Sequence, residues 1–185
     1  MRKGKLMEEN IEKAENFEDL EPLKKFDLDE LHRRQALLDA KFMQKETANE
    51  KTEDGLVDAY FCELGELLQE LKPNWNWWKT KNLTPPDKAK VLEEMSDVLH
   101  FYLSWFKKED FWKKGSLTPY NYQDMIKDDK QAGVILAQLW SQPAKKMFGA
   151  MLVIAECVGA SETEFLEVHH KKSLKNWTVR STENY

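Results

Sequence analysis

The stretch YFCELGELLQEL, residues 60–71, carries large apolar side chains at intervals of three and four residues: Tyr60, Leu64, Leu67 and Leu71. This spacing puts the side chains on one face of an α-helix. A second stretch, VLEEMSDVLHFY at residues 91–102, repeats the pattern with Val91, Met95, Val98 and Tyr102. The two stretches therefore predict a pair of amphipathic helices with matching apolar faces.

The same helical spacing continues through most of the chain, whereas the alternation typical of β-strands is almost absent. The fold class that this predicts is all-α, a helical bundle. We predict its helices at residues 28–38, about 53–71, about 86–107, about 131–158 and from 161 onward.

Residues that commonly begin or end helices lie at these boundaries. They are Asp27 before the first helix, Pro73 after the second, Thr84 or Pro85 before the third, Pro143 within the fourth, Gly159 after it, and Ser161 with Glu164 before the fifth. The last two form the capping-box pattern S-x-x-E, in which each side chain satisfies a backbone amide of the other residue.

A chain of 185 residues suits one domain, which we place at 26–185. Residues 1–25 are rich in Lys and Glu, and we predict a flexible N-terminal arm there. Cys62 and Cys157 each lie in a helical apolar pattern without metal-binding spacing, so we expect reduced thiols in the core.

Charge and hydropathy exclude some classes of protein. The formal net charge of -5 argues against nucleic acid as a partner. No run approaches the roughly 18 consecutive apolar residues of a membrane helix, and the start of the chain lacks the apolar segment of a signal peptide. We therefore expect a cytoplasmic protein without a membrane partner.

Two acidic pairs lie on the two matched helices: Glu63 with Glu66, and Glu94 with Asp97. The members of a pair are three residues apart and occupy neighbouring positions on one helix face. Each pair starts three residues after the first residue of its apolar stripe, so both pairs have the same angle to the packing face. Two such helices side by side could bring four carboxylates together, and these oxygen donors suit Mg²⁺ or Mn²⁺.

The residues alone leave other interpretations open. The acidic pairs also fit a solvated helix face, since Glu is a good helix former. The aromatic run Trp75, Trp77 and Trp78 fits either a base-stacking lid or a hydrophobic plug between helix ends. His100 continues the acidic face, but an isolated histidine also fits a core residue with satisfied hydrogen bonds.

Four segments resemble the dimeric, all-α dUTPases. ELGELLQE (63–70) with WNWWK (75–79) is similar to their ELGELANE…FKFWS, and EEMSDVLHFYLS (93–104) resembles EEYVDxLHFxLS. LHRRQALLDAKF (31–42) is similar to their Q-x-x-L-D/N segment. The end of the chain, KKSLKNWTVRSTENY (171–185), resembles the closing motif K-x-x-x-N-x-x-R-Q-x-x-G-Y.

The resemblance implies an all-α NTP pyrophosphatase that hydrolyses dUTP to dUMP and pyrophosphate with Mg²⁺, as a homodimer. It implies the metal ligands Glu63, Glu66, Glu94 and Asp97, of which Glu63 or Glu66 also acts on the attacking water. The residues that it places near the nucleoside are Gln35, Asp39, Trp78 and His100. Those that it places near phosphate and sugar are Lys172, Asn176, Arg180 and Tyr185.

The closing motif departs from the family pattern at three points. One extra residue separates Asn176 from Arg180, Ser181 replaces the usual Gln, and Asn184 replaces the usual Gly. The family's Phe-Lys-Phe-Trp-Ser run is also changed, to WNWWK at 75–79. Together these changes leave the base preference open, so a dCTP pyrophosphatase or a broader MazG-like enzyme is the nearest alternative. A non-catalytic helical interaction protein is the other alternative, and the four intact acids argue against it. Residues 108–130 have no counterpart in the resemblance.

Overall fold

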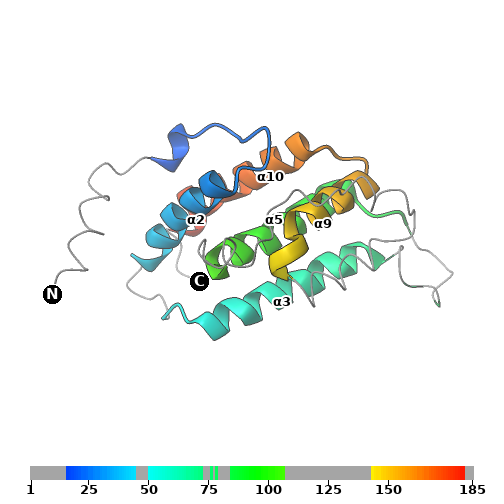
Figure 1. Ribbon diagram of the computed structural model, residues 1–185, viewed down its shortest axis with the longest axis horizontal. Coiled ribbons are helices and arrows are strands. Elements are labelled where there is room, and N and C mark those ends of the chain that lie inside the picture. The colour runs from blue at the N-terminus through cyan, green and yellow to red at the C-terminus, as the bar shows by residue number, and fades with distance from the viewer. Residues whose placement is uncertain are drawn as a thin grey trace.

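The computed structural model describes residues 16–44, 50–72, 76, 78, 84–106 and 143–181, the side chains of 143–146 excepted. The described residues form helices and no strand, which confirms the all-α prediction. In chain order the helices are η1 (Phe17–Asp19), α2 (Leu28–Met43), α3 (Glu53–Glu70), α5 (Lys88–Trp105), α9 (Pro143–Cys157), α10 (Glu162–Lys175) and η2 (Asn176–Arg180). Helix α5 is central, because it contacts α2, α3, α9 and α10 (Figure 1).

Helices α3 and α5 pack through their predicted apolar faces. All eight stripe residues are buried, from Tyr60 to Leu71 on the first stretch and from Val91 to Tyr102 on the second. Figure 1 shows the two helices running side by side. Burial of each large apolar side chain stabilises the fold by about 1.5–3 kcal/mol. The pairing of the stripes therefore fixes how the acidic pairs of the two helices face each other.

Side chains that accept hydrogen bonds from backbone amides set the starts of α2, α3 and α10, and also that of α5. Asp27 caps α2 by accepting from the amide of Glu30 at 3.1 Å, and Thr52 caps α3. Ser161 and Glu164 form the predicted capping box of α10. Gly159 has a φ of 71° after α9, a conformation that favours glycine, so the predicted helix end is also confirmed.

Two local predictions are wrong. Helix α5 is capped by Asp87, whose Oδ1 accepts from the amides of Ala89 at 2.9 Å and Lys90 at 3.4 Å, and not by Thr84 or Pro85. A carboxylate that accepts two amides satisfies more of an open helix end than a hydroxyl that accepts one. The two cysteines are exposed and not in the core, although no disulfide joins them.

Residues 16–25 fall within the predicted N-terminal arm, and they lie against the helices. Phe17 in η1 is only 2% exposed. The amide of Phe26 donates to Oε1 of Glu162 on α10 at 2.6 Å, which holds the end of this segment. Residues 1–15 lie outside the described residues, and a flexible arm there stays a prediction.

Other predictions also lie outside the described residues. These are the part of the fourth helix before Pro143, the region 108–130, Trp75, Trp77 and Tyr185. In the described part of the chain, α9 begins at Pro143 itself. Among the helices that the structure describes, none combines the length and the apolar character needed to cross a bilayer.

Candidate metal and nucleotide site

Three carboxylates converge between α3 and α5. One oxygen from each of Glu63, Glu94 and Asp97 lies within 4.8 Å of the others. The buried stripes turn these partly buried acids toward one another, Glu63 from α3 and the other two from α5. Glu66, the fourth predicted ligand, is exposed at the rim, where its charge raises the pKa of each of the three acids.

Burial and mutual repulsion raise the pKa values in this cluster. For Glu63 burial is the largest cause, followed by the charges of Asp97, Glu66 and Glu94, and its pKa rises to about 7. Burial also raises the pKa of Glu94 and of Asp97. Oε2 of Glu94 is buried and has no hydrogen-bond partner among the described residues. A divalent cation would relieve both the repulsion and the unpaired oxygen, so these residues fit Mg²⁺ or Mn²⁺.

The C-terminal helix brings positive charge to the cluster. Lys172 on α10 donates from Nζ to Oδ2 of Asp97 and to the backbone oxygen of Glu93, the latter at 3.3 Å. Burial raises the pKa of Asp97, whereas Lys172 and Arg180 lower it. Both cations of the closing motif therefore lie close enough to act on an acid of the cluster.

The extra residue between Asn176 and Arg180 lies in a π-helical turn, η2. The amide of Ser181 donates to the oxygen of Asn176, five residues earlier, at 2.9 Å. In a continuous α-helix each step of four residues overshoots a full turn by roughly 40°, so Lys172 and Arg180 would lie about 80° apart. A π turn contains more than four residues, so it turns Arg180 back toward the face of Lys172. The wider turn thus accommodates the extra residue.

A hydrogen-bonded network joins α2, α5 and α10 next to the acids. Gln35 donates from Nε2 to Oδ1 of Asp39 at 2.8 Å and to Oγ of Ser104 at 3.0 Å, so its Oε1 faces Nδ1 of His100, 2.8 Å away. Because an amide oxygen only accepts, Nδ1 of His100 carries the proton. Burial lowers the pKa of His100 well below its usual range. The ring is therefore neutral, and its Nε2, 3.4 Å from Oγ of Ser173, is left as an acceptor.

The comparison with protein families agrees with this arrangement. The dUTPase family model matches residues 27–185, which contain every motif of the candidate site. The chain belongs to the all-α dUTPase family. No curated protein and no solved structure matches it. The match therefore indicates a dUTPase-type nucleotide hydrolase, and the matched residues include the acids and the network.

In this dUTPase-family chain most of the predicted site residues lie on α5, on the helices α2, α3 and α10 that contact it, or on η2 at the end of α10. Asn176 is 8% exposed, and its Oδ1 has no hydrogen-bond partner among the described residues. Trp78 is 57% exposed, and residues 77 and 79 beside it lie outside the described residues. Its place in a base pocket stays a prediction, as does that of Tyr185.

Ser104 and His169 contact the network around His100 and were not predicted from the sequence. Ser104 donates to both oxygens of Asp39 at 2.9 Å, and its position seven residues after Asp97, two helical turns along the same face, was an available signal. The His169 ring lies 4.5 Å from that of His100, centroid to centroid, and its Nδ1 is 2.9 Å from Oγ of Ser96. No motif singles out His169 in the sequence, because it stands in an ordinary helical stretch.

Proposed function

We propose that this chain hydrolyses dUTP to dUMP and pyrophosphate with the help of Mg²⁺. The observation that carries the proposal is the convergence of Glu63, Glu94 and Asp97 within 4.8 Å, beside Lys172 and in a chain of the dUTPase family. Acidic clusters also occur without a metal, and family membership alone does not say that the acids meet. The two observations together favour a metal-dependent hydrolase over a non-catalytic interaction protein.

The clustered acids are the proposed metal ligands, with Glu66 as a further ligand at the exposed rim. A Mg²⁺ ion bound there supplies positive charge that offsets the triphosphate and makes a nearby water more acidic. Glu63 or Glu66 orients the attacking water and accepts its proton. The buried stripes hold these carboxylates in place before the substrate arrives, so little reorganisation is needed during the reaction.

Lys172, Asn176 and Arg180 are proposed to form the phosphate and sugar side of the site. The ammonium and the guanidinium suit phosphate oxygens, because charge-assisted hydrogen bonds are about twice as strong as neutral ones. The buried amide oxygen of Asn176 can accept a hydrogen bond from a sugar hydroxyl. Tyr185 joins this group through the resemblance of the closing motif.

Gln35 and His100 are proposed to face the base, with Asp39 and Ser104 fixing the amide of Gln35 and Trp78 as an outer wall. Nε2 of the neutral His100 is an acceptor. The N3–H group of uracil is a donor and matches it, whereas N3 of cytosine is itself an acceptor. A polar site of this kind discriminates because the wrong base leaves a buried group unpaired. The network therefore favours dUTP over dCTP.

Turnover of dUTP by the purified chain tests this proposal. With MgCl₂ we expect dUMP and pyrophosphate in equal amounts, separated by anion-exchange chromatography, and we expect EDTA to abolish turnover. Release of orthophosphate, or undiminished turnover in EDTA, would contradict the proposed reaction. Parallel reactions with dCTP and dTTP test the base preference, and faster turnover of dCTP would contradict the role given to His100.

A homodimer is a separate proposal, which rests on the family resemblance. Light scattering coupled to size-exclusion chromatography measures it directly. The expected mass is that of two chains of 21.8 kDa each, and the mass of one chain would contradict it.

A further inference from the structure

Phe17 lies outside the matched residues 27–185, yet it is one of the most completely buried side chains of the protein. Its ring stacks on two aromatic rings of the C-terminal segment. The centroids are 6.0 Å from His170, with an interplanar angle of 16°, and 5.7 Å from Trp177, with an angle of 26°. A side chain from the N-terminal segment is thus packed directly against α10 and η2.

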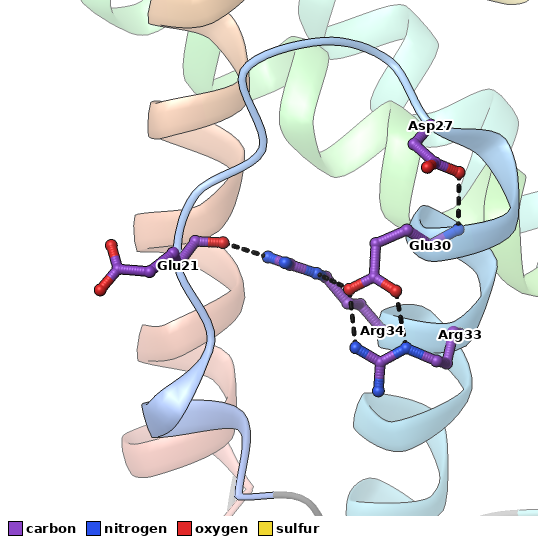
Figure 2. A network of polar contacts seen from close by, with 5 residues as sticks. All are labelled: Glu21, Asp27, Glu30, Arg33 and Arg34. Atoms are coloured by element: carbon purple, nitrogen blue, oxygen red, sulfur yellow. Dashed lines mark hydrogen bonds and ion pairs between the residues drawn. The ribbon is translucent and has the colours of Figure 1, made fainter.

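The segment that carries Phe17 is held to α2 by its backbone. Nη1 of Arg34 donates to the backbone oxygen of Glu21 at 2.7 Å, and Nε of the same guanidinium donates to Glu30 at 2.7 Å. Figure 2 shows Arg34 reaching from α2 to the backbone at Glu21, while Arg33 also donates to the Glu30 carboxylate. These bonds fix the path of the chain that follows η1, so Phe17 is presented to η2 by an anchored segment.

Trp177 is the part of η2 that Phe17 contacts. A π turn is a rare conformation, found mostly as single turns inside α-helices, so side-chain contacts are needed to favour it over a continued α-helix. The ring of Trp177 contacts the ring of Phe17 and the ammonium of Lys41, which lies 5.1 Å from its centroid. Thr178 adds a hydrogen bond from Oγ1 to the backbone oxygen of Leu174 at 2.9 Å.

We propose that Phe17 is a positioning residue for phosphate binding, which clamps Trp177 and thereby holds the π turn that directs Arg180 toward the acid cluster. This inference rests on the proposed function, since it takes Arg180 as a ligand of phosphate. The chain of contacts runs from Phe17 to Trp177, and from Trp177 through the turn to Arg180, three residues later. Loss of the aromatic contact releases the turn, and Arg180 then has to be ordered at the moment of binding.

A double-mutant cycle on the full chain tests the proposal, with inorganic pyrophosphate in MgCl₂ as the probe and calorimetry as the readout. Arg180→Ala should weaken binding about tenfold or more, because it removes a charge-assisted contact. Phe17→Ala should weaken binding about threefold to tenfold in the wild-type background but less than about twofold in the Arg180→Ala background. This loss of the effect is what positioning through Arg180 requires, and a merely structural role would not produce it.

Phe26→Ala is the matched control. Phe26 is an aromatic residue of the same segment, but its ring packs on Phe148 and Phe165, at 4.9 Å and 5.9 Å, and not on η2. It should lower the melting temperature and leave pyrophosphate binding within about twofold of wild type. Phe17→Leu keeps part of the apolar contact and should fall between wild type and Phe17→Ala, which provides a second variant if the alanine variant does not fold.

Two results would overturn the inference alone. The first is pyrophosphate binding by the Phe17 variants equal to that of wild type while Arg180→Ala is weakened. The second is a general loosening of the fold. It would appear as an equal loss of pyrophosphate affinity from Phe17→Ala in both backgrounds, or as a similar loss from Phe26→Ala. Absence of pyrophosphate binding by the wild-type chain would instead overturn the proposed function, and the positioning role with it.

Discussion

Lys172 on α10 donates a hydrogen bond to the carboxylate of Asp97 on α5, so one acid of the cluster is paired with a cation of the protein itself. The two side chains are 15% and 18% exposed, which removes much of the screening that weakens surface pairs. The bond also ties the helix that carries the phosphate-side residues to the helix that carries two of the acids.

The first prediction concerns Lys172→Met. Removal of the ammonium leaves Asp97 without this partner, and in EDTA the free energy of unfolding should fall by about 1.5–3 kcal/mol. With MgCl₂ the loss should shrink to less than about half, since the cation supplies the missing charge. Thermal unfolding with and without Mg²⁺ measures both, and Lys171→Met, at an exposed position next to it, is the control. An equal loss in both buffers would contradict a metal at this cluster.

The second prediction concerns base selectivity. Asp39 accepts from Gln35 at 2.8 Å and from Ser104 at 2.9 Å, which fixes the amide that faces His100. Asp39→Ala frees this amide to rotate, so kcat/KM for dUTP should fall about tenfold. The value of kcat/KM for dCTP should fall less, so the dUTP/dCTP ratio should decrease. Lys51→Met removes only the outer ion pair of Asp39 and should leave the dUTP/dCTP ratio unchanged. An unchanged dUTP/dCTP ratio in Asp39→Ala would show that the network takes no part in base recognition.

The third prediction is a loss of stability in acid that depends on His169. Burial lowers the pKa of His169 to about 3 in the folded protein, below its ordinary value of 6.5. As the pH falls below 6.5 the unfolded chain binds a proton that the folded protein excludes, so stability present above 6.5 is lost progressively toward pH 3. Between pH 7.5 and pH 5 the burial of neutral His169 should lower the free energy of unfolding by about 1.5–2 kcal/mol.

His169→Asn checks this prediction, because the amide can replace the bond of Nδ1 to Ser96 but cannot titrate. Urea titrations at pH 7.5 and pH 5 measure the free energy of unfolding of both proteins. Between these pH values it should fall by about 1.5–2 kcal/mol less in His169→Asn than in wild type. Equal pH dependence in the two proteins would show that His169 is accessible to protons in the folded state.

Much of the fold could be predicted because it depends on local patterns. The stripes ending at Leu71 and Tyr102 follow from the helical period, and the caps at Asp27 and Ser161 follow from side-chain chemistry within three residues. The start of α5 was misplaced because Thr84, Pro85 and Asp87 all favour a helix start, and the choice among them depends on the position of the chain in space.

The site was predictable to the extent that it depends on helix faces. The pattern treats Glu63 and Glu66 alike, yet they differ by about 60° around the helix, and only Glu63 reaches the other acids. The bond of Lys172 to Asp97 joins residues 75 positions apart, beyond any local pattern. Phe17 was assigned to an arm because the composition around it is polar, and a single aromatic residue does not reveal its partner.

The most direct test of a metal-dependent nucleotide site is calorimetric titration with a non-hydrolysable dUTP analogue, in MgCl₂ and in EDTA, for wild type and Glu63→Gln. Wild type should bind the analogue at least about tenfold more tightly with Mg²⁺. Glu63→Gln should lose this difference while keeping its helical circular dichroism, and Asp58→Asn, at an exposed position of the same helix, should keep both. Equal binding in EDTA by wild type, or a full Mg²⁺ effect in Glu63→Gln, would contradict the account.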